Sequence, residues 1–233
     1  MNTDKENSLL NNKIVYDITK FTHLDYPNHL ACVIWFKGCN MRCDYCYNKD
    51  IVFAKDANYS LYDVLDFLKQ RINLLDGVVL SGGEATDYDL VELCKVIKQL
   101  GFKIKLDTNG TNFRNIQLLC ESKLIDFIAL DYKAPAYKHK EITKSNKFNE
   151  FSITLQYLIA SGLDFEVRTT IHADLLSEED INYIIKDLKS RGYSKKYYLQ
   201  RFLDTQNNIG NITSASNSFD DSLLLDDIEV VWR

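Results

Sequence analysis

The chain has 233 residues, of which 45% are hydrophobic and 12% aromatic, with 28 Lys and Arg against 33 Asp and Glu. This composition is typical of a globular protein and excludes wholesale disorder, a collagen-like repeat and a coiled-coil rod. A net charge of -5 argues against nucleic acid as a partner. The N-terminal stretch is polar, and no uncharged apolar run reaches the roughly 18 residues of a membrane span. We therefore expect a cytoplasmic protein without nucleic-acid or membrane partners.

Strand-like and helix-like segments alternate along the chain. The turn signal Tyr26-Pro27-Asn28 predicts that residues 13–30 form a hairpin leading into the first strand. Strands are predicted, in order, at residues 31–36, 77–80, 102–107, 127–131, 165–171 and 197–202. Helices are predicted at residues 60–74, 88–100, 112–120, 148–159 and from Ser177 to Gly192. Residues 137–147 are predicted as a loop, 205–219 as a flexible loop and 228–232 as a candidate last strand.

This alternation predicts an α/β fold with a parallel sheet and helices outside it. The strand-helix units average roughly 29 residues, close to the usual size of such a unit. A closed barrel of eight units typically takes about 250 residues, so this chain is slightly short for one. We expect an incomplete (β/α)6 barrel at residues 30–203, an N-terminal extension at 1–29, and a C-terminal loop and candidate final strand at 204–233.

The six cysteines fall into two groups. Cys39, Cys43 and Cys46 follow the first predicted strand with the spacing C-x3-C-x2-C. Dense cysteine spacing in a reducing cytosol usually means metal ligation, and three ligands leave one position of a metal centre open. A zinc site completed by His23, His29 or Cys32 remains an alternative. The scattered cysteines are predicted to be inert core residues: Cys32, Cys94 and Cys120.

Polar residues also stand at the ends of four later strands. They are Ser81-Gly82-Gly83-Glu84, Asp107 to Gly110, Asp131 with Lys133, and Arg168 with Thr169 and Thr170. Ligand-binding residues of α/β barrels lie at the carboxyl ends of strands, so we expect these sets to meet at one mouth. Taken singly, each set could instead be a solvated strand end, a helix cap or a tight turn.

The cysteine loop resembles that of the radical S-adenosylmethionine (SAM) enzymes, and residues 81–84 are similar to the glycine-rich motif of that family. The resemblance implies a TIM-like radical SAM partial barrel. It further implies that Cys39, Cys43 and Cys46 hold a [4Fe-4S] cluster, with SAM bound at its open iron and Tyr45 packed on the adenine. Gly82, Gly83 and Glu84 would then meet the methionine amino group.

Two further segments resemble the activases of glycyl-radical enzymes. Residues 106–110 and 130–133 are similar to their D-T-N-G and D-x-K motifs, and residues 24–27, 105–110 and 165–170 most resemble activating proteins of anaerobic ribonucleoside-triphosphate reductase. The resemblance implies that Asp107 and Lys133 contact the ribose and methionine portions of SAM, with Arg168 near its carboxylate or ribose. Asp107, Thr108 and Asp131 match positions of a monovalent-cation site in some activases. Asp131 could instead orient Lys133.

The function implied by this resemblance is the activation of a partner enzyme. A reduced cluster would cleave SAM, and the 5′-deoxyadenosyl radical would take a hydrogen atom from a glycine Cα of anaerobic ribonucleoside-triphosphate reductase. A reduced flavodoxin- or ferredoxin-like protein would supply the electron. One alternative is a radical SAM enzyme that acts on a small molecule or a peptide. The other, from a different class, is a non-catalytic iron-sulfur or zinc-binding protein.

Overall fold

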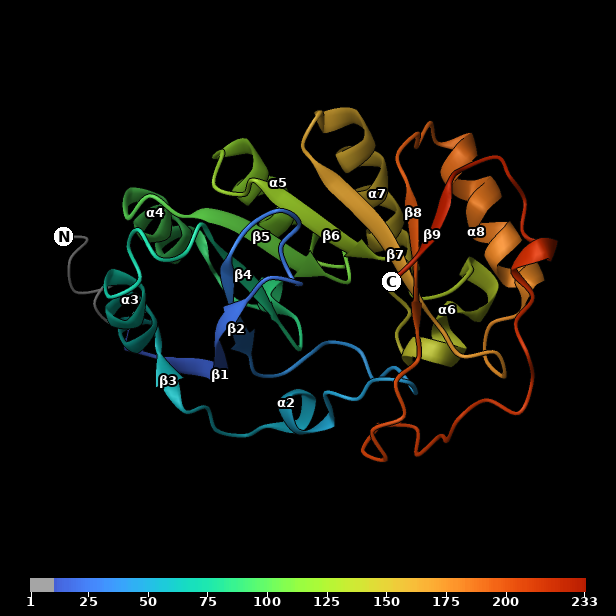
Figure 1. The fold of residues 1–233 in the computed structure, drawn as a ribbon, viewed down its shortest axis with the longest axis horizontal. Helices are drawn as coiled ribbons and strands as arrows, with labels where there is room; N and C mark the ends of the chain where they lie inside the picture. The colour runs from blue at the N-terminus through green and yellow to red at the C-terminus, as the bar shows by residue number, and fades with distance from the viewer. Residues whose placement is uncertain (1–10) are drawn as a thin grey trace. The chain divides into compact units, whose positions relative to one another are not determined.

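The computed structural model describes residues 11–233, which group into two compact units (Figure 1). The first unit contains residues 11–40, 50–108 and 114–128, and the second contains residues 41–49, 109–113 and 129–233. Strand β6, Phe127–Asp131, begins in the first unit and ends in the second. The division into an extension at 1–29, a barrel at 30–203 and a C-terminal part at 204–233 remains a prediction, and residues 1–10 lie outside the described part.

The first unit has five strands before β6, in the order β3-β1-β2-β4-β5. Strands β2, β4 and β5 are parallel, whereas β1 is antiparallel to both β2 and β3. The predicted N-terminal hairpin is therefore confirmed, and Asn28 in its turn has a left-handed φ of 62°. The elements are β1 Lys13–Thr22, β2 Ala31–Phe36, α2 Lys49–Phe53, β3 Tyr59–Ser60, α3 Leu61–Lys69, β4 Gly77–Gly82, η1 Ala85–Asp87, α4 Val91–Gln99, β5 Lys103–Thr108 and α5 Phe113–Glu121.

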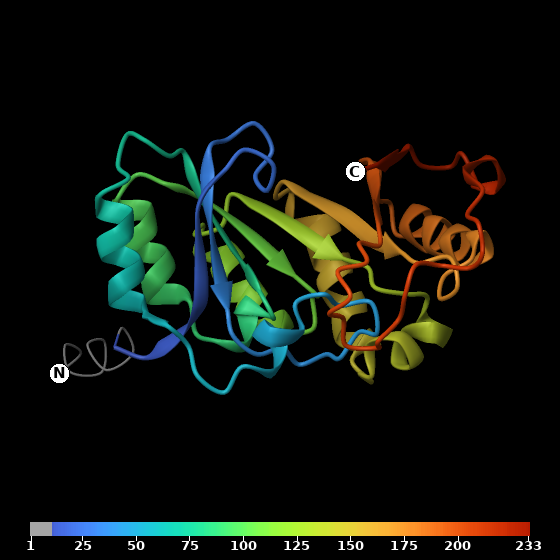
Figure 2. The ribbon, with the colours of Figure 1, turned by 60° about the horizontal axis from the view of Figure 1, so that its bottom comes forward.

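Helix α3 shows how the sequence sets an element's start and end. Ser60 caps it: the Ser60 hydroxyl accepts the Asp63 N–H, and the Asp63 carboxylate accepts the Ser60 N–H. The helix ends at Lys69, earlier than the predicted residue 74, and the chain continues in turns that include Asn73 with its left-handed φ of 65°. Ile72 and Leu74, which extend the apolar pattern, are exposed. Helices α3 and α4 lie side by side next to the strands of this unit (Figures 1 and 2).

The second unit contains the end of β6 and three further strands in the order β7-β8-β9, of which β8 is parallel to both β7 and β9. The predicted last strand is thus confirmed as β9. Helix α8 begins at the predicted cap Ser177, which forms a capping box with Asp180. The elements are α6 Ala136–Thr143, α7 Phe148–Ser161, β7 Phe165–Ile171, α8 Glu178–Ser190, β8 Tyr197–Arg201, η2 Asp221–Leu223 and β9 Val230–Trp232.

The prediction of a loop at residues 137–147 is wrong, because helix α6 occupies most of it. The helix follows Pro135 and ends before Lys144, whose φ of 58° is left-handed. Its buried residues are His139, Ile142 and Thr143, spaced as one helical face. Two of these three are polar, so the face carries no apolar periodicity to reveal the helix.

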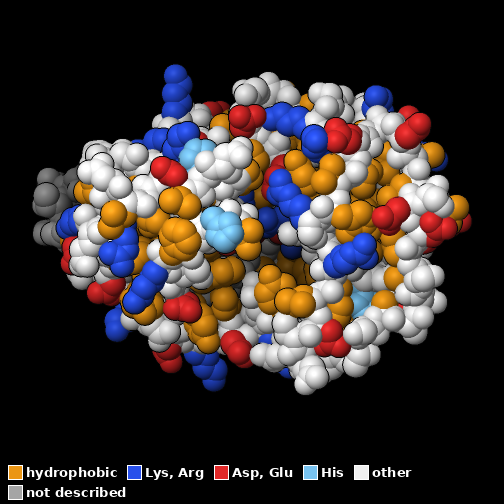
Figure 3. Space-filling model, viewed as in Figure 1, with side chains coloured by type: hydrophobic (Ala, Val, Ile, Leu, Met, Phe, Trp, Pro, Cys, Tyr) orange, Lys and Arg blue, Asp and Glu red, His pale blue; other side chains and the backbone are white. Residues whose placement is uncertain are grey.

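The predicted α/β fold with a mostly parallel sheet is confirmed. In each unit the strands carry fully buried aliphatic side chains, such as Val79 and Leu106 in the first and Leu130 and Leu199 in the second. Within residues 11–233 no helix is long and apolar enough to cross a lipid bilayer. Acidic and basic side chains are interspersed on the face drawn in Figure 3.

Candidate functional site

Gly82 and Gly83 allow the end of β4 to touch the backbone that leads to Cys39. A Cβ on Gly82 would lie 2.4 Å from the backbone N and O of Phe36, and one on Gly83 would lie 1.7 Å from the Gly38 carbonyl oxygen. The Gly83 N–H donates to the Phe36 oxygen, and the Glu84 N–H donates to the Gly38 oxygen, both at 2.9 Å. Only residues without a side chain fit here, so the glycine pair supports the segment that carries the first cysteine.

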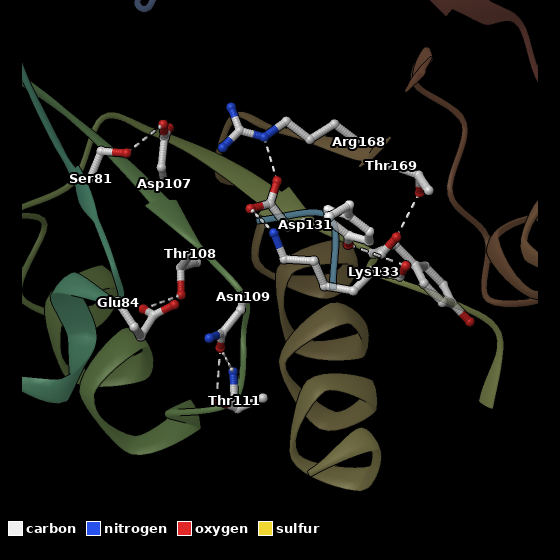
Figure 4. Close-up of polar contacts among 12 residues, drawn as sticks. Ser81, Glu84, Asp107, Thr108, Asn109, Thr111, Asp131, Lys133, Arg168 and Thr169 are labelled. Atoms are coloured by element: carbon white, nitrogen blue, oxygen red, sulfur yellow. Dashed lines mark hydrogen bonds and ion pairs between the residues drawn. The ribbon is translucent and has the colours of Figure 1, made fainter. Parts of the chain in front are cut away.

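Glu84 has a buried carboxylate that joins the ends of β4 and β5. Its Oε1 atom accepts hydrogen bonds from the Thr86 N–H at 3.2 Å, the Thr86 hydroxyl, and the Thr108 hydroxyl at 2.7 Å. Figure 4 shows Glu84 and Thr108 facing each other. The predicted ligand residues Glu84 and Thr108 are therefore brought together, and their side chains hold each other in place.

Asp107, at the end of β5, has a partner on each carboxylate oxygen. Oδ2 accepts a hydrogen bond from the Ser81 hydroxyl at 3.1 Å (Figure 4), and Oδ1 forms an ion pair with Lys105. The Lys105 side chain is only 2% exposed. Because Lys105 and Asp107 are two positions apart on one strand, they share a face of the sheet.

In the second unit, Asp131 forms ion pairs with both Lys133 and Arg168. Lys133 Nζ lies 2.8 Å from Asp131 Oδ2, and Arg168 Nε donates to Asp131 Oδ1 (Figure 4). The Tyr132 N–H donates to the Arg168 oxygen at 2.9 Å, so the residue after β6 bonds to the middle of β7 here. Burial alone would raise the pKa of Asp131, but the two cations hold it well below its usual range. Two positive charges against one negative charge leave this trio with an excess of positive charge.

Tyr45, Cys43 and Cys46 belong to the same unit as this trio. The buried Tyr45 hydroxyl donates to the Lys133 carbonyl oxygen at 3.4 Å. Burial raises the pKa of the Cys43 thiol to about 12, although the Lys133 charge opposes this effect, and burial likewise raises the pKa of Cys46. The structure thus brings together the predicted metal ligand Cys43 and the predicted cofactor-binding residues Tyr45 and Lys133.

The complete predicted set is divided between the two units. Cys39, Gly82, Gly83, Glu84, Asp107 and Thr108 lie in the first, whereas Cys43, Tyr45, Cys46, Asp131, Lys133 and Arg168 lie in the second. Among residues 11–233, no three His, Cys, Asp or Glu side chains are grouped so that they could hold a metal ion. The metal-ligand set of Cys39, Cys43 and Cys46 therefore stays a prediction.

Sequence reasoning assigned no role to the side chains that hold the predicted ones. Lys105 and Ser81 fix the Asp107 carboxylate, and Thr86 fixes Glu84. The only sequence signal for Lys105 was its position two residues before Asp107. Because a lysine on a strand is usually exposed, that position alone did not indicate a buried ion pair.

The family model of the radical SAM superfamily matches residues 33–190, which is more than half of the chain. The chain belongs to this superfamily. As a radical SAM enzyme it is of a class that uses a [4Fe-4S] cluster and SAM. The interpretation as a non-catalytic iron-sulfur or zinc-binding protein is thereby set aside.

Two curated relatives narrow the likeness within the superfamily. A candidate glycyl-radical enzyme activating enzyme of Methanocaldococcus jannaschii is 32% identical over 199 residues, which cover 81% of this chain and 80% of the relative. The pyruvate formate-lyase-activating enzyme of Streptococcus mutans is 33% identical over 150 residues, covering 58% of this chain and 56% of that enzyme.

Solved structures agree on the fold. Streptococcus suis SuiB, in its complex with the precursor peptide SuiA, superposes with a TM-score of 0.63 at 17% identity. The match covers 77% of this chain but only 41% of the SuiB chain. At this identity the likeness concerns the α/β fold alone.

The donor set suits the cofactors of the superfamily. Thiols are the protein ligands that iron-sulfur clusters require, and the structure contains all six cysteines as thiols. Cys43 and Cys46 lie in one tight turn, closed by the Cys46 N–H donating to the Cys43 oxygen at 3.0 Å. The cationic Asp131, Lys133 and Arg168 trio can take an anionic group such as a carboxylate.

Proposed function

We propose that this radical SAM enzyme activates a glycyl-radical enzyme by removing a hydrogen atom from a glycine of that partner. The observation that carries the proposal is the 32% identity to the candidate activating enzyme of M. jannaschii, which extends over 80% of that relative. The similarity of residues 106–110 and 130–133 to activase motifs supports the same assignment.

In this proposal Cys39, Cys43 and Cys46 hold the cluster. Gly82 and Gly83 have two roles in this proposal. Their missing side chains leave room for the segment that carries Cys39, and they leave backbone oxygens accessible to the amino group of the SAM methionine. The carboxylate of Glu84, held by Thr86 and Thr108, keeps that glycine turn in shape.

The remaining contacts to SAM would come from charged strand ends and one aromatic ring. Lys133 and Arg168 supply positive charge for the methionine carboxylate, Asp107 faces the ribose, and Tyr45 packs on the adenine. A bound cluster would supply the electron that cleaves SAM to the radical that attacks the partner's glycine. The protein's own task is to orient SAM and to exclude water.

The protein activated would be anaerobic ribonucleoside-triphosphate reductase. The likeness of residues 24–27, 105–110 and 165–170 to activating proteins of anaerobic ribonucleoside-triphosphate reductase supports that reductase as the protein activated. A reduced flavodoxin- or ferredoxin-like protein would donate the electron. Docking of either partner is expected to involve protein surfaces only, without nucleic acid or membrane.

The test is anaerobic reconstitution with iron and sulfide, followed by reduction with SAM and the host's anaerobic ribonucleotide reductase. We expect 5′-deoxyadenosine and a glycyl-radical doublet in the electron paramagnetic resonance spectrum. Cys43→Ala should abolish both, whereas the matched control Cys120→Ala, which changes a cysteine outside the motif, should retain both. SAM cleavage without a doublet would refute the activation of this reductase and favour a small molecule or a peptide as the substrate.

A further inference from the structure

A short segment after β8 lies against the turn that carries two of the cysteines. Residues 208–212, which we name the C-terminal strap, belong to the same unit as residues 41–49. The Ile209 N–H donates to the Cys46 oxygen at 3.0 Å, and the Gly210 N–H donates to the Asp44 oxygen at 2.8 Å. Figures 1 and 2 both show the orange to red chain after β8 passing beside the blue to cyan segment before α2.

The approach at Gly210 is too close for a side chain. A Cβ on this residue would lie 2.7 Å from the Asp44 Cβ and 2.9 Å from the Asp44 Cα and carbonyl oxygen. Most of these neighbours are backbone atoms, which cannot move aside by rotating a side chain. Gly210 does not have a left-handed φ, so the reason for glycine here is contact and not backbone conformation.

The strap is also held in shape by its own residues. The buried Asn208 side chain donates to the Ile212 oxygen at 2.6 Å and accepts the Ile212 N–H at 2.8 Å. The two bonds close a loop around Ile209 and Gly210. The N–H groups of these two residues are therefore presented to the cysteine turn in a fixed direction.

The same turn is also held by the end of α6. The Arg42 N–H donates to the Thr143 oxygen at 2.9 Å, and the Asp44 N–H donates to the Ile142 oxygen at 3.1 Å. Carbonyl groups of helix α6 thus accept hydrogen bonds from N–H groups of the turn, and N–H groups of the strap donate hydrogen bonds to carbonyl groups of the turn. Together they fix the backbone on which Cys43 and Cys46 stand.

We propose that Asn208, Ile209 and Gly210 are positioning residues for the iron-sulfur site, because they preset the backbone that carries Cys43 and Cys46. The inference rests on the proposed cluster ligands. The family model matches residues 33–190, so the strap lies outside the region that this model describes. A ligand shell held by a rigid surrounding shell needs little reorganisation when it binds its metal.

The first experiment measures amide hydrogen exchange in the metal-free chain. Gly210→Ala should push the strap away, and Asn208→Ala should loosen it without adding bulk. In both variants we expect exchange at residues 42–47 to become at least about tenfold faster, as in a local opening. Gly192→Ala is the control for general destabilisation, because Gly192 has a left-handed φ of 88° and nothing within 4 Å of an added Cβ.

The second experiment measures iron release from the reconstituted chain to a chelator, together with the cluster's reduction potential. We expect release at least about fivefold faster in both strap variants, and a shifted potential, because solvent exposure tunes such clusters. Three results would overturn the proposal. The first is an unchanged exchange rate at residues 42–47 in both strap variants, and the second is an equal increase of that rate in Gly192→Ala. The third is faster exchange in the strap variants without faster iron release. A wild-type chain that binds no iron would refute the proposed cluster. The hydrogen-exchange experiment uses the metal-free chain, so it would still measure whether the strap stabilises the cysteine turn.

Discussion

Asp131 is a carboxylate whose charge is more than balanced by its neighbours. Lys133 binds one of its oxygens and Arg168 binds the other. Because each cation is fixed by the same carboxylate, both are oriented before any ligand arrives. A ligand carboxylate that enters this trio meets preset positive charge, which is the condition for a strong charge-assisted hydrogen bond.

Lys133→Ala should weaken SAM binding and leave the iron content unchanged. The backbone oxygen of Lys133 that accepts the Tyr45 hydroxyl is retained, so the loss concerns the ammonium group. Loss of one charged hydrogen bond, about 1.5 to 3 kcal/mol, corresponds to a rise of roughly tenfold or more in the Kd for SAM. Equilibrium dialysis measures this. Lys138→Ala, which removes a lysine paired with Asp180, is the control, and unchanged SAM affinity in Lys133→Ala would contradict the assigned role.

The ion pair of Asp107 with Lys105 concerns the predicted monovalent-cation site. Lys105 already supplies a positive charge to Asp107, as Lys133 and Arg168 do to Asp131. We therefore expect these lysine and arginine side chains to neutralise the two carboxylates without a bound monovalent cation. Replacing potassium by tetramethylammonium at constant ionic strength should change the Kd for SAM less than about twofold.

Lys105→Met provides the matched test, because it removes that charge and keeps a similar volume. In this variant Asp107 loses the Lys105 ion pair, and SAM binding should come to depend on potassium by about fivefold or more. Isothermal titration calorimetry in the two salts measures the difference. A strong potassium requirement in the unaltered chain would show instead that a bound cation belongs to the site.

At the scale of elements, the contact between the end of β4 and the segment before Cys39 is a backbone-to-backbone fit. Gly83→Ala would place a Cβ 1.7 Å from the Gly38 oxygen, so one of the two segments must move. We expect a loss of stability of about 1 to 3 kcal/mol and incomplete iron loading. Urea unfolding and iron per chain measure the two effects.

Gly101→Ala is the control for this substitution. Its left-handed φ of 91° makes an alanine cost about 1 kcal/mol of stability through backbone strain, but an added Cβ meets nothing within 4 Å. We expect this variant to bind iron normally. Equal iron loss in both variants would show that stability, and not the Cys39 segment, limits cluster assembly.

For the molecule as a whole, the sequence predicted those features that local patterns encode. The six strands, the hairpin turn at Asn28 and the helix start at Ser177 all have signals within a few residues, and all are present. The alternation of strands and helices was enough to predict the α/β class. The polar residues at the ends of β4 and β6 were found for the same reason, since Ser81 and Asp131 each directly follow an apolar run.

Features that depend on distant residues could not be predicted in this way. Helix α6 buries His139 and Thr143 against neighbours that only the fold supplies. The Lys105 and Asp107 pair is buried by surrounding strands, and the strap contacts Cys46 through backbone atoms, which carry no sequence signal. Gly210 was one glycine in a segment rich in Asn and Ser, where flexibility was the simpler interpretation.

The position of the strap has a consequence for biosynthesis. Ile209 and Gly210 leave the ribosome about 160 residues after Cys46, which at usual rates of synthesis is a delay of roughly 10 to 30 seconds. During that time the cysteine turn lacks the donors that bind the Cys46 and Asp44 oxygens. The Cys43 and Cys46 thiols are therefore made early but acquire this backbone support only after residue 210 has been synthesised, so loading with iron is best matched to a chain in which the strap is already present.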